Sequence, residues 1–232
     1  MNSGVPRAMS QIYMVRHGQA CLKSDNYDQL SALGHQQSQW LGEYFQSCNL
    51  KFDHIYQGDM VRHNETVDGI SRGMGVNFKA KNTMAELNEF DFESLLKVYV
   101  QQYPEKSLPK TASIREYYHL LKQAMHDWSN DGLEGDLPES WSQFQQRVET
   151  AYSHIQENCE GTVLVVSSGG TNSMLLAQVL KAPAETVVEL NLQSRNTGLS
   201  HFFFNKHAIR LTSFNNTPHL DTHDKREFIT FS

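Results

Sequence analysis

The sequence is poor in cysteine and proline, and it has no long apolar run. Its only cysteines are Cys21, Cys48 and Cys159. Because they are odd in number, far apart and without a Cys-x-x-Cys spacing, they argue against a disulfide framework and against a cysteine zinc site. We expect all three to be small buried hydrophobic side chains. The six prolines are scattered singly and mark no linker, so we expect one domain around a single core.

Features typical of membrane proteins and nucleic-acid-binding proteins are also missing. No stretch approaches the roughly 18 consecutive apolar residues of a membrane span, and the N-terminus lacks the layout of a signal peptide. We therefore expect a cytoplasmic protein. A formal net charge of -6 without a lysine or arginine run argues against nucleic acid and anionic membrane as partners. Residues 1–9 are interpreted as a flexible leader or tag and residues 10–232 as the domain, while self-association stays open.

The rest of the sequence alternates between strand-like and helix-like segments. Apolar, β-prone stretches predict strands at residues 11–15, 53–56, 76–80, 162–166, 200–204 and 208–214. Helical spacing predicts helices at residues 33–48, after a cap at Ser31, and at 61–72, 114–128, 141–158 and 171–181. This order implies an α/β fold with three layers, in which helices flank a mostly parallel sheet. Residues 94–138 hold helical pieces without a strand, and we expect a helical cap insertion over the sheet.

Three of the predicted strands end in residues suited to anion binding. Arg16, His17 and Gly18 follow the first strand, at the position where open α/β sheets bind ligands. The second strand precedes a helix that begins near Arg62, and the strand at 162–166 precedes residues 168–170, a glycine turn into a helix. A histidine at a single strand end is more often structural than catalytic. Three converging ends with two arginines, a histidine and a helix N-terminus predict a phosphate pocket.

Five short motifs stand in a specific order between about residues 14 and 219. They are Val15-Arg16-His17-Gly18, Leu30-Ser31-Ala32-Leu33-Gly34, Gly58-Asp59-Met60-Val61-Arg62 followed by Glu65-Thr66, Leu87-Asn88-Glu89, and Val165-Val166-Ser167-Ser168-Gly169-Gly170. Each motif is weak alone. Together the sequence resembles the histidine phosphatase superfamily, in its phosphoglycerate mutase-like branch.

The resemblance implies a role for each residue of the pocket. His17 would attack phosphorus and become transiently phosphorylated, as a neutral imidazole can near neutral pH. Arg16 and Arg62 would hold the phosphate through charge-assisted hydrogen bonds. Glu89 matches the family's general acid and base, whereas its acidic neighbours are interpreted as solvated loop residues: Glu86, Asp91 and Glu93. The implied activity is hydrolysis of a small phosphorylated molecule, with no metal ion and no other cofactor.

The pocket departs from the family pattern at the strand end near residue 167. Where most members carry a second histidine, this chain has Ser168, which can donate a hydrogen bond but brings no positive charge. We expect Ser168 and Gly169 to bind phosphate, with a rate lower by on the order of 100-fold to 1,000-fold. His63 is a conceivable substitute for the missing histidine. Because neighbouring helix side chains point about 100° apart, we expect it to be directed away from the site that Arg62 faces.

Two further positions differ from the pattern near the first motif. Ala20 stands where a threonine is usual, and Lys23 stands where an asparagine usually contacts phosphate. Lys23 could restore positive charge, although a solvated lysine is the preferred interpretation.

Other functions fit the sequence less well than a phosphatase. The missing charge at residue 168 leaves open a weak or inactive pseudo-phosphatase that binds a phosphorylated ligand. A phosphoglycerate mutase is less favoured, because residues 90–93 read Phe-Asp-Phe-Glu in place of the mutases' Arg-His-Tyr-Gly. Residues 219–224 offer several metal-ligand types but lack a His-Glu-x-x-His motif, so we interpret them as a packed tail.

Overall fold

The protein is described by a computed structural model that covers residues 9–21, 28–109 and 111–231. Within these residues six strands form one sheet in the order β3-β2-β4-β1-β5-β6. The strands are β1 (Ser10–Arg16), β2 (His54–Gln57), β3 (Asn82–Thr83), β4 (Thr162–Ser167), β5 (Leu199–Asn205) and β6 (Ala208–Asn216). β1 to β4 are mutually parallel, and β5 and β6 extend the sheet as an antiparallel pair beside β1. The predicted α/β class with a mostly parallel sheet is confirmed.

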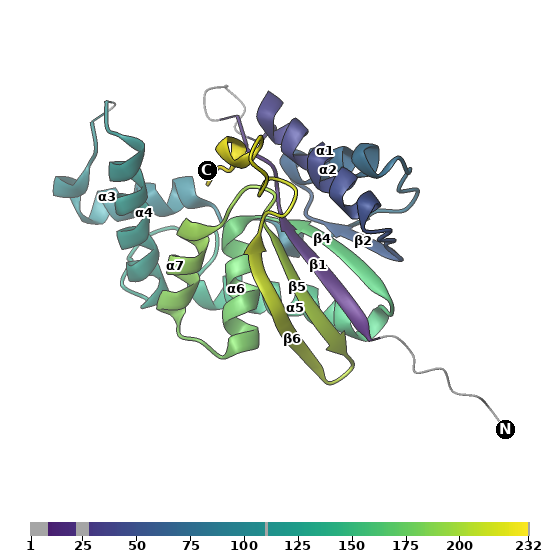
Figure 1. Ribbon diagram of the computed structural model, residues 1–232. Helices are drawn as coiled ribbons and strands as arrows, with labels where there is room; N and C mark the ends of the chain where they lie inside the picture. The colour runs from purple at the N-terminus through teal and green to yellow at the C-terminus, as the bar shows by residue number, and fades with distance from the viewer. Residues whose placement is uncertain (1–8, 22–27, 110, 232) are drawn as a thin grey trace.

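Helices cover both faces of this sheet. They are α1 (Ala32–Ser47), α2 (Val61–Met74), α3 (Phe92–Gln102), α4 (Ile114–Ser129), α5 (Trp141–Asn158), α6 (Gly169–Leu180) and α7 (Ala184–Gln193). Figure 1 shows α1 and α2 on one side of the sheet and α5, α6 and α7 on the other, with α3 and α4 beyond α7. Short 3-10 helices lie at Ala85–Leu87, Pro104–Lys106 and Arg226–Phe228. Helices on both faces of the sheet give the three layers that the sequence predicts.

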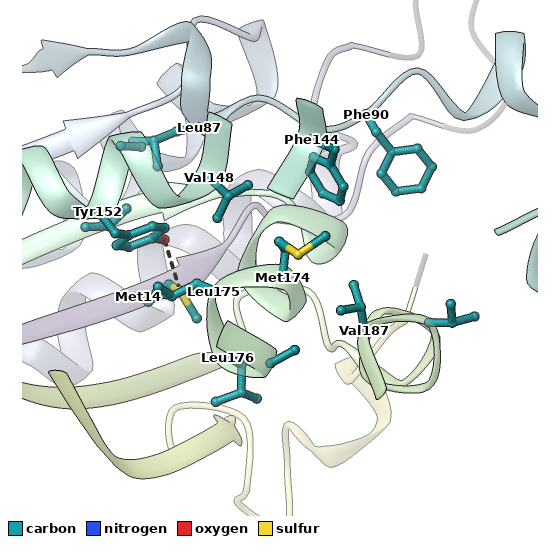
Figure 2. Packing of buried hydrophobic residues seen from close by; sticks show 14 of the residues in the cluster. Met14, Leu87, Phe90, Phe144, Val148, Tyr152, Met174, Leu175, Leu176 and Val187 are labelled. Atoms are coloured by element: carbon teal, nitrogen blue, oxygen red, sulfur yellow. Dashed lines mark hydrogen bonds between the residues drawn. The ribbon is translucent and has the colours of Figure 1, made fainter. Parts of the chain in front are cut away.

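The alternation of side chains along the buried strands divides the core into two parts. In β4, Val163 and Val165 face the cluster under α5, α6 and α7, whereas Leu164 and Val166 face the cluster under α1 and α2. This follows from the two-residue period of a strand, since both faces of a central parallel strand are covered. Figure 2 shows the larger cluster, in which the Tyr152 hydroxyl lies 3.1 Å from the Met14 sulfur.

The larger cluster extends from the sheet to the helices of residues 94–138. Trp128 of α4 stacks on Phe144 of α5, with ring centroids 5.5 Å apart, and meets Trp141 edge-on at 5.0 Å. Phe90 packs against both Trp128 and Phe144. These aromatic contacts attach α4 to the rest of the core, next to the segment that carries Glu89. No helix of the described residues is long and apolar enough to cross a membrane.

Strongly periodic segments were predicted well from sequence. The helix at 141–158 is confirmed to the residue, and its buried residues share one face. Ser31 caps α1 as expected, because its hydroxyl accepts a hydrogen bond from the Gly34 amide at 3.0 Å. α2 runs two residues beyond the prediction, to Met74, and is capped by Gly75, which adopts the left-handed conformation.

Three predictions about the fold are wrong. Residues 76–80 form no strand, because β2 pairs with Asn82–Thr83 and Val76 lies 47% exposed on the way there. The helix α7 was missed, since only Val187 and Val188 of it are buried. The cysteines are not uniformly buried: Cys159 is buried, but Cys21 is half-buried and Cys48 is exposed after the last turn of α1. The predicted leader, residues 1–8 in particular, lies outside the described residues.

Candidate active site

The residues predicted to bind phosphate follow β1, β2 and β4, which end side by side. β4 lies between β2 and β1, and all three run parallel. The His17 amide donates to the Ser167 carbonyl at 2.9 Å, and the Gly58 amide donates to the Val166 carbonyl at 3.3 Å. Neighbouring strands lie about 4.8 Å apart, so the residues that follow the three strands are forced together. The predicted convergence of the three strand ends is therefore present.

His17 is held in one tautomer at this edge. Its side chain is almost fully buried, and its Nδ1 lies 2.7 Å from the Gly18 carbonyl, an acceptor, so Nδ1 carries the proton. Its Nε2 then presents a lone pair, which accepts a hydrogen bond from Arg62 Nε at 3.2 Å. Burial lowers the pKa of His17 well below its usual range, and the guanidinium groups of Arg62 and Arg16 lower it further. The imidazole is therefore neutral at physiological pH with Nε2 as its basic atom.

The first turn of α2 fixes Arg62 beside His17. The Arg62 Nη1 donates to Asp28 Oδ1 at 2.8 Å, and Asp28 Oδ2 accepts from the Val61 amide at 3.0 Å. Thr66 accepts from the Gly18 amide at 3.1 Å and donates to the Arg62 carbonyl at 2.7 Å. These bonds connect α2 to the loop after β1, so Arg62 and His17 are positioned as a unit.

Arg16 lies on the other side, against the start of α6. Its Nη1 donates to the carbonyl oxygens of Ser194 and of Phe231, the latter at 3.1 Å. A Cβ on Gly169 would lie 3.3 Å from Arg16 Nε and within 2.6 Å of Asn191 Oδ1. Glycine at this position therefore allows the guanidinium to approach the N-terminal end of α6, which favours anions.

Glu89 is also placed at the start of α6. The Gly170 amide donates to Glu89 Oε2 at 3.0 Å. The two preceding carbonyls are held by neighbouring hydroxyls, since Ser167 donates to the Leu87 carbonyl and Thr171 to the Asn88 carbonyl, each at 2.6 Å. Of its acidic neighbours, Asp91 is exposed and caps α3, Glu93 is exposed and Glu86 is half-buried. Glu89 is thus the acidic residue of this loop that reaches the strand ends.

The expectation that His63 is directed away from the site is wrong. Its ring is fully buried, its Nε2 lies 2.7 Å from Ser168 Oγ, and its centroid lies 5.8 Å from that of His17. Arg62 and His63 do point in different directions, but the first turn of α2 faces two strand ends at once. Arg62 faces the residue after β1, and His63 faces the residue after β4. The sequence does contain a signal for this role of His63. A histidine directly follows Arg62 in a chain that has Ser168 where the family usually has its second histidine.

The sequence of the chain matches the family model of the histidine phosphatase superfamily (branch 1) over residues 12–217. The chain belongs to this superfamily. The matched region contains every predicted site residue, from Arg16 to Gly169. A comparison with curated protein sequences gives no match.

Solved structures share the fold of this superfamily member. A phosphoglycerate mutase from Bacillus anthracis is 18% identical with a TM-score of 0.64, covering 91% of this chain and 95% of that one. The alpha-ribazole phosphatase from Shigella flexneri is 21% identical with a TM-score of 0.61, covering 89% and 96%. The phosphoserine phosphatase from Entamoeba histolytica, solved with 3-phosphoglyceric acid, is 20% identical with a TM-score of 0.62, covering 91% and 100%. At these identities the likeness establishes the fold, which is phosphoglycerate mutase-like.

Ala20 and His219 of this histidine phosphatase superfamily chain have contacts of their own outside the residues predicted to bind phosphate. Ala20 forms an isolated antiparallel bridge with Leu30, and Lys23 lies outside the described residues. His219 is buried, and its Nε2 lies 2.8 Å from Thr197 Oγ1. In the part of the chain that the structure describes, no cluster of three or more His, Cys, Asp or Glu side chains is arranged to hold a metal ion.

Proposed function

We propose that the protein is a phosphomonoester hydrolase that acts through a phosphohistidine at His17. The observation that carries this proposal is the fixed tautomer of His17, whose Nδ1 is paired with the Gly18 carbonyl and whose Nε2 lone pair meets Arg62. A nucleophile that attacks a phosphate needs an available lone pair, and it needs a nearby cationic group that offsets the negative charge of the phosphate. Both are supplied here by side chains that are at least nine-tenths buried.

In the first step a substrate phosphate replaces Nε2 as the acceptor of the Arg62 hydrogen bond. Arg62 and Arg16 bind its oxygens, with Gly169 and Ser168 as further donors at the start of α6. His17 Nε2 then forms a bond to phosphorus, and the ester P–O bond breaks. The leaving oxygen takes the proton carried by Glu89. Oε1 is the oxygen that fits this role, because its contact to the Phe90 amide is long, at 3.3 Å, while Oε2 is bonded to Gly170.

In the second step water regenerates the enzyme. Glu89 takes a proton from a water molecule, whose oxygen attacks phosphorus as the bond to His17 Nε2 breaks. Inorganic phosphate leaves, and His17 is again neutral. Each proton is carried by a side chain of this chain, so the scheme uses no metal ion and no cofactor.

The substrate in this proposal is a small phosphorylated molecule. The names of two structural neighbours support a phosphatase over a mutase, since one is an alpha-ribazole phosphatase and the other a phosphoserine phosphatase. The helix α4 approaches the residue after Glu89 through the contact of Trp128 with Phe90, and we propose that residues 94–138 act as the cap over the substrate. No nucleic acid or membrane partner is part of this proposal, and the protein would act in the cytoplasm.

The test is hydrolysis of an aryl phosphate in the presence of a chelator. We expect phosphate release that is lost in His17→Ala and kept in the matched control His207→Ala, which removes an exposed histidine from the turn between β5 and β6. A phosphoenzyme trapped by quenching should be stable in alkali and labile in acid, as a phosphohistidine is.

One observation favours a second function, a pseudo-phosphatase that binds a phosphorylated ligand. Ser168 brings no positive charge to the pocket. Binding of inorganic phosphate with no release from aryl phosphate, equal in the natural protein and in His17→Ala, would select this second function and contradict hydrolysis.

A further inference from the structure

Ser168 uses its hydroxyl in an unusual way for a residue that begins a helix. It is the N-cap of α6, but its side chain accepts no hydrogen bond from the amides of that helix, and the Gly170 amide donates to Glu89 instead. An N-cap serine normally satisfies one of these amides. Here its fully buried hydroxyl lies 2.7 Å from His63 Nε2.

The surroundings of His63 show that its ring is built into this position. The ring is fully buried, and a Cβ on Gly58 would collide with it, so the glycine after β2 provides the space that it occupies. Among the described residues its Nδ1 has no hydrogen-bond partner. Burial lowers the pKa of His63 well below its usual range, and Arg62 lowers it further, so the ring is neutral.

These surroundings decide the direction of the hydrogen bond. A neutral imidazole carries one N–H. If the proton were on Nδ1, a buried donor would be left without an acceptor, which proteins rarely tolerate, whereas a lone pair without a donor is the lesser cost. The proton therefore lies on Nε2 and is donated to Ser168 Oγ. The hydroxyl proton of Ser168 is then free to be donated elsewhere.

We propose that His63 is a positioning residue that orients the Ser168 hydroxyl to donate its hydrogen bond to a phosphoryl oxygen on His17. Ser168 follows β4 directly, and the preceding residue, Ser167, is bonded to the His17 amide at 2.9 Å, so the two side chains start from adjacent points. His63 and Ser168 together would supply the hydrogen bond that the family's second histidine donates, but without the positive charge of that histidine. No proton is transferred in this step. The inference rests on the proposed function of His17.

A serine and a histidine at this distance could instead act as nucleophile and base. The structure argues against it. A base that takes the serine proton becomes a cation, and His63 has Arg62 as its immediate neighbour and, among the described residues, no acceptor at Nδ1 to stabilise the charge. The Nε2 lone pair of His17 also needs no deprotonation before it can attack, since the neutral ring carries its proton on Nδ1. Ser168 is therefore assigned as a donor.

The experiment compares steady-state kinetics on an aryl phosphate for single and double variants. We expect Ser168→Ala to lower kcat by about 100-fold with a smaller change in KM, because the hydrogen bond strengthens in the transition state. His63→Phe, which keeps a ring without the N–H, should lose most of the same factor. His63→Gln, which can place an amide N–H near Nε2, should recover most of that loss. The double variant Ser168→Ala with His63→Phe should be no slower than Ser168→Ala alone.

Several outcomes would overturn the positioning role. Multiplicative losses in the double variant would show that His63 acts independently of Ser168. Equal losses in His63→Phe and His63→Gln, together with lower thermal stability in both, would make His63 a packing residue. A phosphoenzyme that is stable in acid and absent from Ser168→Ala would make Ser168 the nucleophile. Ser173→Ala is the matched control, since Ser173 is a buried serine of the same helix outside the site, and its kcat should match that of the natural protein.

A binding measurement separates this inference from the proposed function. Calorimetric titration with inorganic phosphate and with orthovanadate reports on the donors even if no substrate is hydrolysed. We expect Ser168→Ala and His63→Phe each to weaken orthovanadate binding by roughly tenfold, and His63→Gln to weaken it less. Unchanged orthovanadate binding in Ser168→Ala and His63→Phe would exclude the donor pair, whereas the expected losses without hydrolysis would exclude only the phosphatase.

Discussion

At the scale of single residues, the pairing of Ser168 with His63 determines what a restored histidine at position 168 would do. Ser168 Oγ lies 2.7 Å from His63 Nε2, and both side chains are fully buried. A histidine added at 168 has no room while His63 is present. We expect Ser168→His to be less active than the natural protein and destabilised by about 1–3 kcal/mol through overpacking.

The same variant combined with His63→Ala should recover stability and exceed Ser168→His in kcat/KM, because the new ring then has space and adds a donor that can become charged. Aryl phosphate kinetics and thermal unfolding of the two variants check this. A gain in rate for Ser168→His alone, at unchanged stability, would refute the steric argument.

The neutral state of His17 gives a second prediction at this scale. Because burial, Arg62 and Arg16 lower the pKa of His17, the acid form should be absent between pH 7 and pH 6. We expect no loss of kcat/KM from His17 protonation in this range. In Arg62→Gln one cationic neighbour is gone, so the pKa of His17, followed by NMR, should rise while burial keeps it below the usual value of about 6.5. Arg72→Gln, an exposed arginine of the same helix, is the control and should leave the titration unchanged. A His17 pKa near 6.5 in the natural protein would contradict the structure.

Sequence reasoning predicted which strand ends lie together, because the motifs follow directly on parallel strands. It failed at His63, since a single helix was considered apart from the sheet. A rotation of 100° directs a side chain away from one neighbour, but at a sheet edge it directs that side chain toward the next strand. Such a contact depends on the strand order, here β2-β4-β1, which the spacing of motifs does not contain.

At the scale of elements, the position of α2 depends on its close packing against α1. The helices approach each other at glycines, and a Cβ on Gly73 would lie 2.8 Å from the Glu43 amide nitrogen and 2.9 Å from Gly42 Cα. α2 carries both Arg62 and His63 in its first turn. We expect Gly73→Ala to destabilise the protein by about 2 kcal/mol or more, although alanine favours helices.

Gly75 offers a matched comparison two residues later. It has a φ of 66° at the end of α2, and the nearest atom to an added Cβ is 3.8 Å away. Gly75→Ala should therefore lower the free energy of unfolding by only about 1 kcal/mol, because alanine disfavours the left-handed backbone conformation. Urea unfolding of the two variants measures the difference. A larger loss in Gly75→Ala than in Gly73→Ala would show that backbone conformation, and not the helix contact, limits this pair.

The elements that sequence reasoning predicted correctly are those whose burial is periodic, such as α5. The β-prone residues 76–80 were misassigned because a strand needs a partner as well as propensity, and β2 pairs with Asn82 and Thr83 instead. α7 was missed because its buried surface is small. Pro183, directly before its first residue, was the available signal.

At the scale of the whole molecule, buried neutral histidines couple folding to pH. His17, His63 and His219 all have pKa values lowered by burial, that of His219 to about 3. In the unfolded chain each has a pKa of about 6.5, so below that pH unfolding takes up protons. Their contribution to stability is complete above about pH 6.5 and decreases as the pH falls toward the folded values. About one pH unit below 6.5 and lower, the free energy of unfolding should fall by about 1.4 kcal/mol per pH unit for each such histidine.

Urea unfolding between pH 7 and pH 5 tests this coupling, in a range above the titration of most carboxylates. His219→Gln keeps an amide that can bond to Thr197, and it removes one of the protons that unfolding takes up. We expect its pH slope to be smaller than that of the natural protein, by a difference that grows below about pH 6.5 and approaches about 1.4 kcal/mol per pH unit near pH 5. His207→Gln, an exposed position, should leave the slope unchanged. Equal slopes in the natural protein and His219→Gln would mean that His219 is already protonated in the folded state, against the lowering of its pKa by burial.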